Sequence, residues 1–145
     1  MLRTRLLHPE ILQALAMSGH FSQVMIADGN YPFVSRSHSE TRRVYLNLAP
    51  GMVRTTEVLD VLAETIPIQG ALMMRVPDGQ EAPIVGEYRA RLPAAVEIDF
   101  AERQAFYDRV SSSTTSLLIA TGETRRFANL LLTVGVVKLE TSETY

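Results

Sequence analysis

The residues best suited to acid–base chemistry are His20 and Asp28, which flank the short apolar run 24–27. Histidine titrates near neutrality and can donate or accept a proton. Asp28 directly follows the run, and ligands of open α/β sheets bind beyond the carboxyl ends of strands. The pattern predicts a proton-transfer group and an anchoring carboxylate, both at the mouth of an α/β sheet. The alternatives are a surface histidine near a helix C-terminus and a turn aspartate ahead of Pro32.

A second group of candidate residues follows another apolar run, 116–120. Its members are Thr121, Gly122, Glu123, Phe127, Ala128 and Asn129. Backbone amides, an asparagine side chain and an aromatic ring are what a sugar site uses, for hydroxyl groups and for the apolar ring face respectively. These residues predict a polar binding site at a strand's carboxyl end. A simple loop, with Asn129 bridging backbone groups, is the alternative, and such a site could also bind without catalysing.

Composition excludes several classes of function. The chain has 145 residues, a formal net charge of -2 and no cysteine. Nucleic-acid binding is not expected without a basic face, and disulfides, thiolate catalysis and soft-metal sites need cysteine. Neither nucleotide fingerprint nor the G-x-S-x-G and H-E-x-x-H motifs occur, and the three histidines have no ligand spacing. We therefore expect proton transfer without a metal or cofactor.

The lengths and spacing of the apolar segments indicate where the protein is located and which fold it adopts. No run resembles a signal peptide or approaches a membrane span, so we expect a cytoplasmic protein without membrane contact.

Strand and helix patterns alternate, which predicts one α/β domain over 1–145, a three-layer α/β/α arrangement with a largely parallel sheet. The first helix starts at Pro9 with Gly19 as its left-handed stop, and Thr55 and Thr56 cap the second. The other predicted helices are 84–92 and 102–110. The predicted strands are 24–27, 44–48, 71–76, 96–98 and 116–120, followed by one or two short strands over 130–132 and 134–139 and a frayed tail at 141–145.

Ordered landmarks along the chain resemble the family of fucose mutarotases and ribose pyranases, which interconvert cyclic forms of free sugars. They are Leu7-His8-Pro9-Glu10-Ile11-Leu12, Gly19-His20, Ile26-Ala27-Asp28, Pro32, Ala105-Phe106-Tyr107-Asp108-Arg109, Thr121-Gly122-Glu123, Asn129 and Gly135-Val136.

The resemblance implies that His20 is the proton donor and that Asp28 binds sugar. Arg103 matches the arginine of the fucose branch, where ribose-type members have histidine; a solvated first-turn residue is the alternative. Phe127 replaces the family's usual tyrosine, which loses a hydroxyl, while Ala128 and Asn129 follow as expected.

The implied activity is an isomerase, an L-fucose-like mutarotase that opens the sugar ring with acid–base help. The alternatives are D-ribose pyranase activity, a non-catalytic monosaccharide-binding accessory protein, or a ligand-binding module unrelated to sugars. Relatives form ring-shaped decamers with sites at subunit contacts, so the resemblance implies self-association here.

Overall fold

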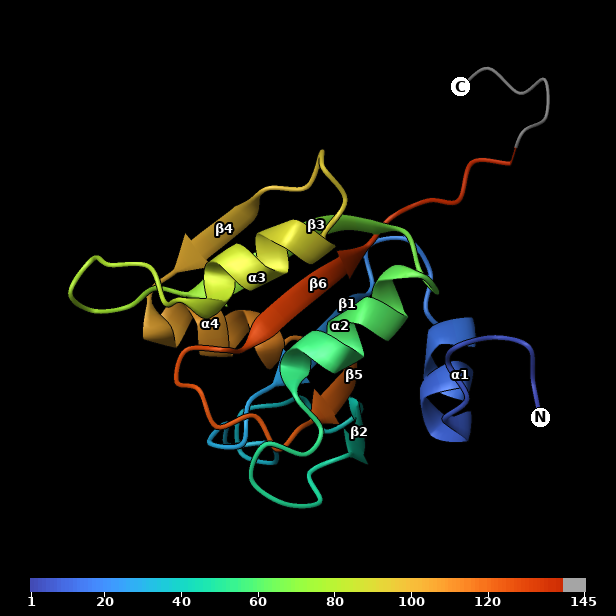
Figure 1. Cartoon of the computed structure of the whole chain (residues 1–145), viewed down its shortest axis with the longest axis horizontal. Coiled ribbons are helices and arrows are strands. Elements are labelled where there is room, and N and C mark those ends of the chain that lie inside the picture. Colours follow the sequence, from blue (N-terminus) through green and yellow to red (C-terminus); the bar gives the residue numbers. More distant parts are fainter. Residues whose placement is uncertain (140–145) are drawn as a thin grey trace.

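Residues 1–139 are described by the computed structural model and form a six-stranded sheet with helices on both faces (Figure 1). The strand order is β2-β5-β1-β6-β3-β4. β6 pairs antiparallel with β1 and β3, and the other neighbouring strands pair in parallel. The predicted α/β class, three layers and largely parallel sheet are confirmed. The tail predicted at 141–145 lies outside the described residues.

The elements follow the predicted alternation closely. In chain order they are α1 (Pro9–Ala16), β1 (Gln23–Ala27), β2 (Arg42–Tyr45), α2 (Thr55–Ala63), β3 (Ile68–Met74), α3 (Ile84–Arg91), β4 (Ile98–Ala101), α4 (Arg103–Val110), β5 (Thr115–Ala120) and β6 (Leu130–Val134).

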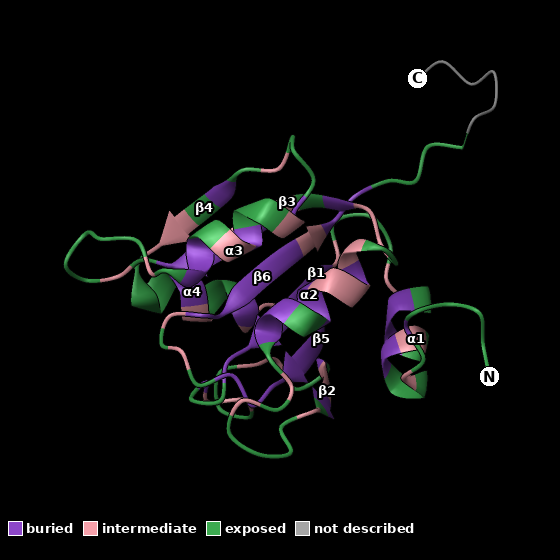
Figure 2. Cartoon of the chain, in the orientation of Figure 1, coloured by how far each residue is buried: buried purple, intermediate pink, exposed green. Residues whose placement is uncertain are grey.

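Two apolar clusters hold the layers together, one on each face of the sheet. α1, α2 and α3 pack on one face, where the cluster includes Ile11, Leu59 and Tyr88. α4 covers the other face through Phe106 and Val110. Every residue of β1 is buried, which fits a central strand covered on both sides (Figure 2). The carboxyl ends of the parallel strands are left open to form a site.

Several local details differ from the sequence prediction, and β4 is Ile98–Ala101 where a strand over 96–98 was predicted. α1 ends at Ala16, and the left-handed residue in the following turn is Phe21 (φ 70°), not Gly19. The reason is tertiary, because the Phe21 amide donates to the Val134 carbonyl (3.0 Å) and its ring stacks on a neighbour. β2 begins at Arg42 and ends at Tyr45, earlier than predicted.

At the end of the chain, where one or two short strands were predicted over 130–132 and 134–139, residues up to 139 form one strand, β6. Its pairing with β3 ends at Val134, and the Gly135 amide donates to the carbonyl of Pro67, the residue before β3 (2.7 Å). Across residues 1–139, no helix combines the length and apolar character that crossing a bilayer requires.

Candidate functional site

The turn after β5 is tied to the carboxyl end of β1. The amide and the hydroxyl of Thr121 both donate to the Ala27 carbonyl, at 3.1 and 2.7 Å. The Gly29 amide in turn donates to the Glu123 carbonyl (2.9 Å). Gly122 is enclosed so tightly that a Cβ there would lie 2.2 Å from the Met52 carbonyl oxygen. These contacts bring the two predicted candidate segments side by side.

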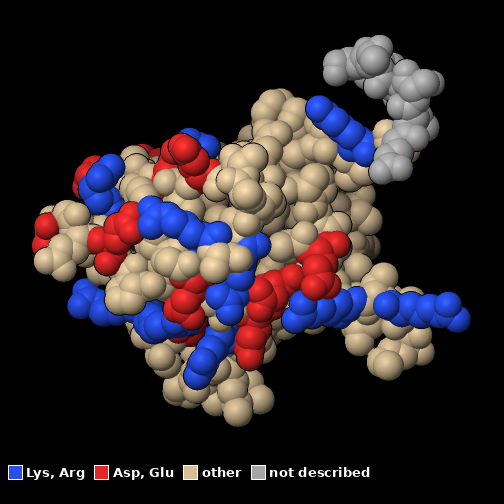
Figure 3. Space-filling model, turned by 45° about the horizontal axis from the view of Figure 1, so that its top comes forward, with Lys and Arg blue, Asp and Glu red and all other residues tan. Residues whose placement is uncertain are grey.

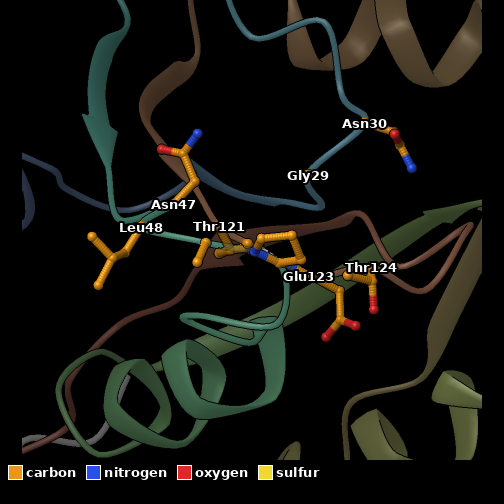
Figure 4. A pocket seen from close by; sticks show the side chains of 10 residues that line it. Gly29, Asn30, Asn47, Leu48, Thr121, Glu123 and Thr124 are labelled. Carbon is orange, nitrogen blue, oxygen red and sulfur yellow. Dashed lines mark hydrogen bonds between the residues drawn. The ribbon is translucent and has the colours of Figure 1, made fainter.

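Glu123 uses its carboxylate within this turn. The side chain is 2% exposed, accepts from Arg125 Nε (2.9 Å) and from the Thr55 hydroxyl (3.1 Å), and points toward the start of α2 (Figure 4). The hydroxyl predicted to cap α2 is thus committed to Glu123, and Arg54 is the N-cap instead. Burial alone would raise the pKa of Glu123, but these donors outweigh it and lower the pKa to about 2. Glu123 is therefore a structural anion.

Asp28 has a different environment at the same edge. It is 2% exposed, and its carboxylate accepts from the amides of Asn30 (3.0 Å) and Ala128 (3.4 Å). Its own amide donates to the Asn129 side-chain oxygen (2.8 Å). Burial raises the pKa of Asp28, against the opposing effect of the backbone amides. The backbone of the second candidate segment therefore fixes the carboxylate in place.

A pocket of about 340 Å³ opens above Asp28. It brings together four of the predicted substrate-binding residues: Asp28, Arg103, Phe127 and Asn129. The fifth, Ala128, is buried behind them and contributes its amide to Asp28. Residues from both candidate segments therefore lie at one pocket, and α4 supplies Arg103 as its first residue.

The pocket also contains residues that sequence analysis missed, among them Tyr31, Met74, Tyr107 and Arg126. A helical signal was available for Tyr107, which lies one turn after Arg103 on α4 and so shares its face. Arg126 is adjacent to Phe127 in the chain, and its guanidinium carbon lies 5.6 Å from the ring centroid. No sequence pattern indicated Met74.

Phe127 adopts a backbone conformation that is uncommon outside glycine, with φ 57°. This geometry turns the chain so that the following amide reaches the Asp28 carboxylate. Such strained residues persist where surrounding contacts over-determine them and cluster at functional sites.

A neighbouring pocket of about 390 Å³ shares Asn30 with the first (Figure 4). Its walls come from three segments: Gly29 after β1, Asn47 and Leu48 after β2, and Thr121 after β5. The carboxylate beside it, Glu123, is already paired with Arg125. We therefore place the candidate site in the Asp28 pocket.

His20 lies at the other end of the sheet from this pocket. It precedes β1 while Asp28 follows it, and because β1 has five residues, the strand's ends are about 15 Å apart at about 3.3 Å per residue. The exposed imidazole lies 2.9 Å from the Gln69 side-chain oxygen and stacks on Phe21, with ring centroids 3.7 Å apart. The prediction that both groups lie at one mouth of the sheet is wrong within a single chain.

Among residues 1–139, no group of three or more His, Asp or Glu side chains forms a metal-ligand set. The site consists of a carboxylate, an amide, guanidinium groups and aromatic rings. These groups can bind hydroxyls and an apolar sugar face.

Comparison with known proteins places the chain in a family. Residues 1–137 match the RbsD / FucU transport protein family. The chain belongs to this family. A D-ribose pyranase of Variovorax paradoxus is 32% identical over 141 residues, covering 94% of this chain and 98% of the relative. A fucose mutarotase of Danio rerio is 30% identical over 146 residues, covering 92% of each.

A solved RbsD / FucU family relative has the same fold. The fucose mutarotase from Streptococcus pneumoniae, in complex with L-fucose, is 30% identical with a TM-score of 0.73, covering 90% of this chain and 94% of that one. The RbsD / FucU membership accounts for the ordered landmarks in the sequence. The family includes relatives named for ribose and relatives named for fucose, and both kinds have similar sequence identity to this chain.

Proposed function

We propose that this protein is a sugar mutarotase or pyranase, an isomerase that interconverts cyclic forms of a free monosaccharide. One observation carries the proposal: the Asp28 pocket combines a fixed carboxylate, the Asn129 amide and an aromatic ring in a space of about 340 Å³. Polar groups of this kind orient hydroxyls, and the Phe127 ring supplies an apolar face for sugar C–H groups.

The reaction needs proton transfer at two sugar atoms. A proton goes to the ring oxygen while another leaves the anomeric hydroxyl, the ring opens to the aldehyde, the bond rotates, and the ring closes again. Asp28 retains oxygen lone pairs beyond those used by two backbone amides, so it would accept the proton that leaves the anomeric hydroxyl. A guanidinium has N–H donors and no acceptor, so Arg103 would orient sugar hydroxyls and would not act as a base.

His20 is the proposed proton donor, and we infer that it comes from a second copy of the chain. The separation along β1 prevents His20 from reaching the pocket of its own chain. Its exposure leaves the imidazole available to a neighbour. Self-association that seats this end of one copy against the pocket of another would complete the site, in a ring-shaped oligomer such as the decamer that the family resemblance implies.

An L-fucose-like sugar is our first candidate and D-ribose the second. Arg103 supports the fucose type, since its side chain lines the pocket at the start of α4. The missing hydroxyl of Phe127 leaves non-catalytic monosaccharide binding as a further candidate function.

Saturation-transfer NMR on equilibrated anomers tests the proposal with fucose, ribose, galactose, rhamnose and glucose. We expect exchange above the buffer rate for at least one sugar. His20→Ala and Asp28→Asn should each slow it by about 100-fold or more, since general acid–base help contributes roughly 10²–10⁴. His38→Ala, in the loop before β2, is the matched control and should keep the parental rate. Exchange at the buffer rate with every sugar would refute catalysis.

A further inference from the structure

The imidazole of His20 is held by two contacts within its own chain. Its Nε2 lies 2.9 Å from the Gln69 side-chain oxygen, and its ring stacks on Phe21 with an angle of 19° between the two planes. Stacking restricts the plane of the imidazole but leaves rotation within that plane free. The hydrogen bond to Gln69 restricts this rotation, so the two contacts together fix the direction in which each ring nitrogen points.

Gln69 reaches His20 because β3 is irregular at this residue. In the ladder between β3 and β6, Ile68 and Gly70 face neighbouring residues of β6, so that Gln69 is the extra residue of a β-bulge. A bulge re-aims a side chain and is common next to active sites. The side chain of Gln69 is exposed and extends to the turn that carries His20.

The sequence landmark Gly135 leaves room for this side chain. A Cβ at position 135 would lie 3.3 Å from the Gln69 Cβ and 3.5 Å from the Gln69 side-chain oxygen. The Gly135 amide donates to the Pro67 carbonyl (2.7 Å), which keeps the glycine beside the start of β3. Glycine at this position therefore lets Gln69 pass close to the backbone that follows β6 and reach His20.

The turn that carries His20 is fixed by backbone hydrogen bonds. The Phe21 amide donates to the Val134 carbonyl (3.0 Å), and the Val134 amide donates to the Ser22 carbonyl (2.8 Å). The Gly19 amide donates to the Ser22 hydroxyl (3.1 Å). Because the backbone is held in this way, the orientation of the imidazole depends on the contacts of its side chain.

The hydrogen-bond partner of His20 is uncharged. Acidic and basic side chains alternate on the face in Figure 3, but none of the ion pairs within residues 1–139 includes His20. An amide oxygen accepts hydrogen bonds and cannot donate them, so Nε2 carries a hydrogen in its contact with Gln69. Nδ1 makes no hydrogen bond to the described part of the chain and is therefore the nitrogen left to face a ligand.

We propose that Gln69 is a positioning residue for the acid–base step, because it retains the Nε2 hydrogen of His20 and makes Nδ1 the atom that exchanges a proton with the sugar. This inference rests on the proposed function and assigns the residue that orients its donor.

The proposed step begins with His20 as imidazolium. The Nδ1–H bond breaks as its proton passes to the sugar ring oxygen, the bond from that oxygen to the anomeric carbon breaks, and the proton of the anomeric hydroxyl goes to Asp28. Ring closure reverses these transfers and returns both protons. The Nε2–H bond stays intact throughout, with its hydrogen donated to the Gln69 oxygen.

Three variants of Gln69 in the full chain test the inference by NMR exchange, with whichever sugar of the panel exchanges. Gln69→Glu keeps an acceptor and should keep kcat near the parental value. Gln69→Met has no comparable acceptor and Gln69→Lys has only donors, so each should lower kcat by about tenfold or more, since a small misplacement of a reacting group is costly. KM should stay near the parental value because Gln69 does not hold the sugar.

Gln13→Met is the matched control. It removes another exposed glutamine whose side-chain oxygen accepts a hydrogen bond, in this case from Arg42, and it should change neither kcat nor KM. Parental kcat in both Gln69→Met and Gln69→Lys would overturn the inference and leave the proposed function standing. A loss in Gln69→Glu equal to that in Gln69→Met would also overturn it, because an acceptor would then not be what His20 needs.

If no sugar exchanges, the proposed function fails and the ring spectrum of His20 still decides the inference. Two-bond ¹H–¹⁵N correlation of protein labelled at histidine, recorded with the rings neutral, distinguishes the two tautomers, and His20→Ala identifies the His20 signals. We expect the Nε2–H tautomer in the parent and an added Nδ1–H form in Gln69→Met. The Nδ1–H tautomer in the parent, or identical His20 spectra in the two proteins, would overturn the role of Gln69.

Discussion

Two buried carboxylates, Asp28 and Glu123, lie at the same edge of the sheet but have opposite electrostatics. Glu123 is neutralised by Arg125, and its pKa falls to about 2. Within residues 1–139, Asp28 has no cationic partner of that kind, and burial raises its pKa. One carboxylate therefore supports the turn, while the other remains available for a ligand.

The Glu123 environment predicts a specific dependence of stability on pH. A carboxyl whose pKa is depressed in the folded state stabilises the protein above its unfolded pKa, and this contribution is lost as pH falls through the folded value. With the pKa going from 4.5 to about 2, the contribution is about 3 kcal/mol, lost progressively between about pH 5 and pH 2. Asp28, with its raised pKa, changes stability in the opposite direction.

Chemical denaturation between pH 2 and 7 checks this prediction. The free energy of unfolding of Glu123→Gln should decline less on acidification than that of the parent. Glu97→Gln, at an exposed position before β4, should follow the parent. Parallel curves for Glu123→Gln and the parent would show that the buried ion pair does not cause the loss of stability at acid pH.

Gly122 gives a second prediction at the scale of one residue. A Cβ there would lie 2.2 Å from the Met52 carbonyl oxygen and 2.3 Å from that of Ala49. Because both obstacles are backbone atoms, Gly122→Ala must displace a loop and should lower the unfolding free energy by about 2 kcal/mol or more. Gly86→Ala, in α3 with nothing within 4 Å of the added carbon, should be neutral or stabilising by about 0.5–1 kcal/mol. Thermal unfolding of the two variants provides the measurement, and equal midpoints would contradict it.

At the scale of elements, α3 supports the pocket through one buried side chain. The Tyr88 hydroxyl lies 2.5 Å from the Ala128 carbonyl oxygen and 2.7 Å from Thr55 Oγ1. Burial raises the pKa of Tyr88, so the hydroxyl keeps its proton at physiological pH. Both peptide groups of Ala128 are thus hydrogen-bonded. The Ala128 carbonyl accepts from the Tyr88 hydroxyl, and the Ala128 amide donates to the Asp28 carboxylate.

Tyr88→Phe should therefore lower the unfolding free energy and also disturb the geometry of the pocket. Removing the donor leaves the buried Ala128 carbonyl without it, which costs about 1–3 kcal/mol of unfolding free energy. We expect anomer exchange to fall together with stability, because the Ala128 amide orients Asp28. Tyr45→Phe, at an exposed position in β2, is the control and should change neither denaturation nor exchange. Full activity in Tyr88→Phe would mean that the α3 contact does not position the site.

The sequence predicted the elements and the pocket better than it predicted the location of His20. Asp28, Arg103, Phe127 and Asn129 converge because the carboxyl ends of parallel strands meet at one edge and α4 begins beside them. Gly19 was mistaken for the turn's left-handed residue because the Phe21 conformation depends on a contact with β6, which is distant in sequence.

The error over His20 had a signal in the sequence. A residue before a strand and one after it lie at opposite ends, so the predicted strand 24–27 already separated His20 from Asp28. Met74 and Arg126 could not be assigned to the pocket in advance, since their positions depend on how β3 and the last turn pack against α4.

At the scale of the whole molecule, the proposed site is incomplete in one chain. The pocket holds the groups that would bind sugar, and the imidazole is exposed at the opposite end of β1. A copy that presents its His20 end to a neighbour's pocket leaves its own pocket free for another copy. Repetition of this head-to-tail contact produces a closed ring or an open filament.

Mixing two inactive variants tests whether the site is shared. If His20 acts in another copy's pocket, His20→Ala and Asp28→Asn remove different halves of each site. Coexpressed in equal amounts, they should form mixed oligomers in which about one site in four contains both native residues. We expect NMR anomer exchange near a quarter of the parental rate, while each variant alone stays near the buffer rate. The double variant His20→Ala/Asp28→Asn coexpressed with the parent is the control for oligomer mixing. Mixed oligomers, confirmed by mass, that remain inactive would show that a site needs His20 and Asp28 from the same chain, and would contradict a site shared between copies.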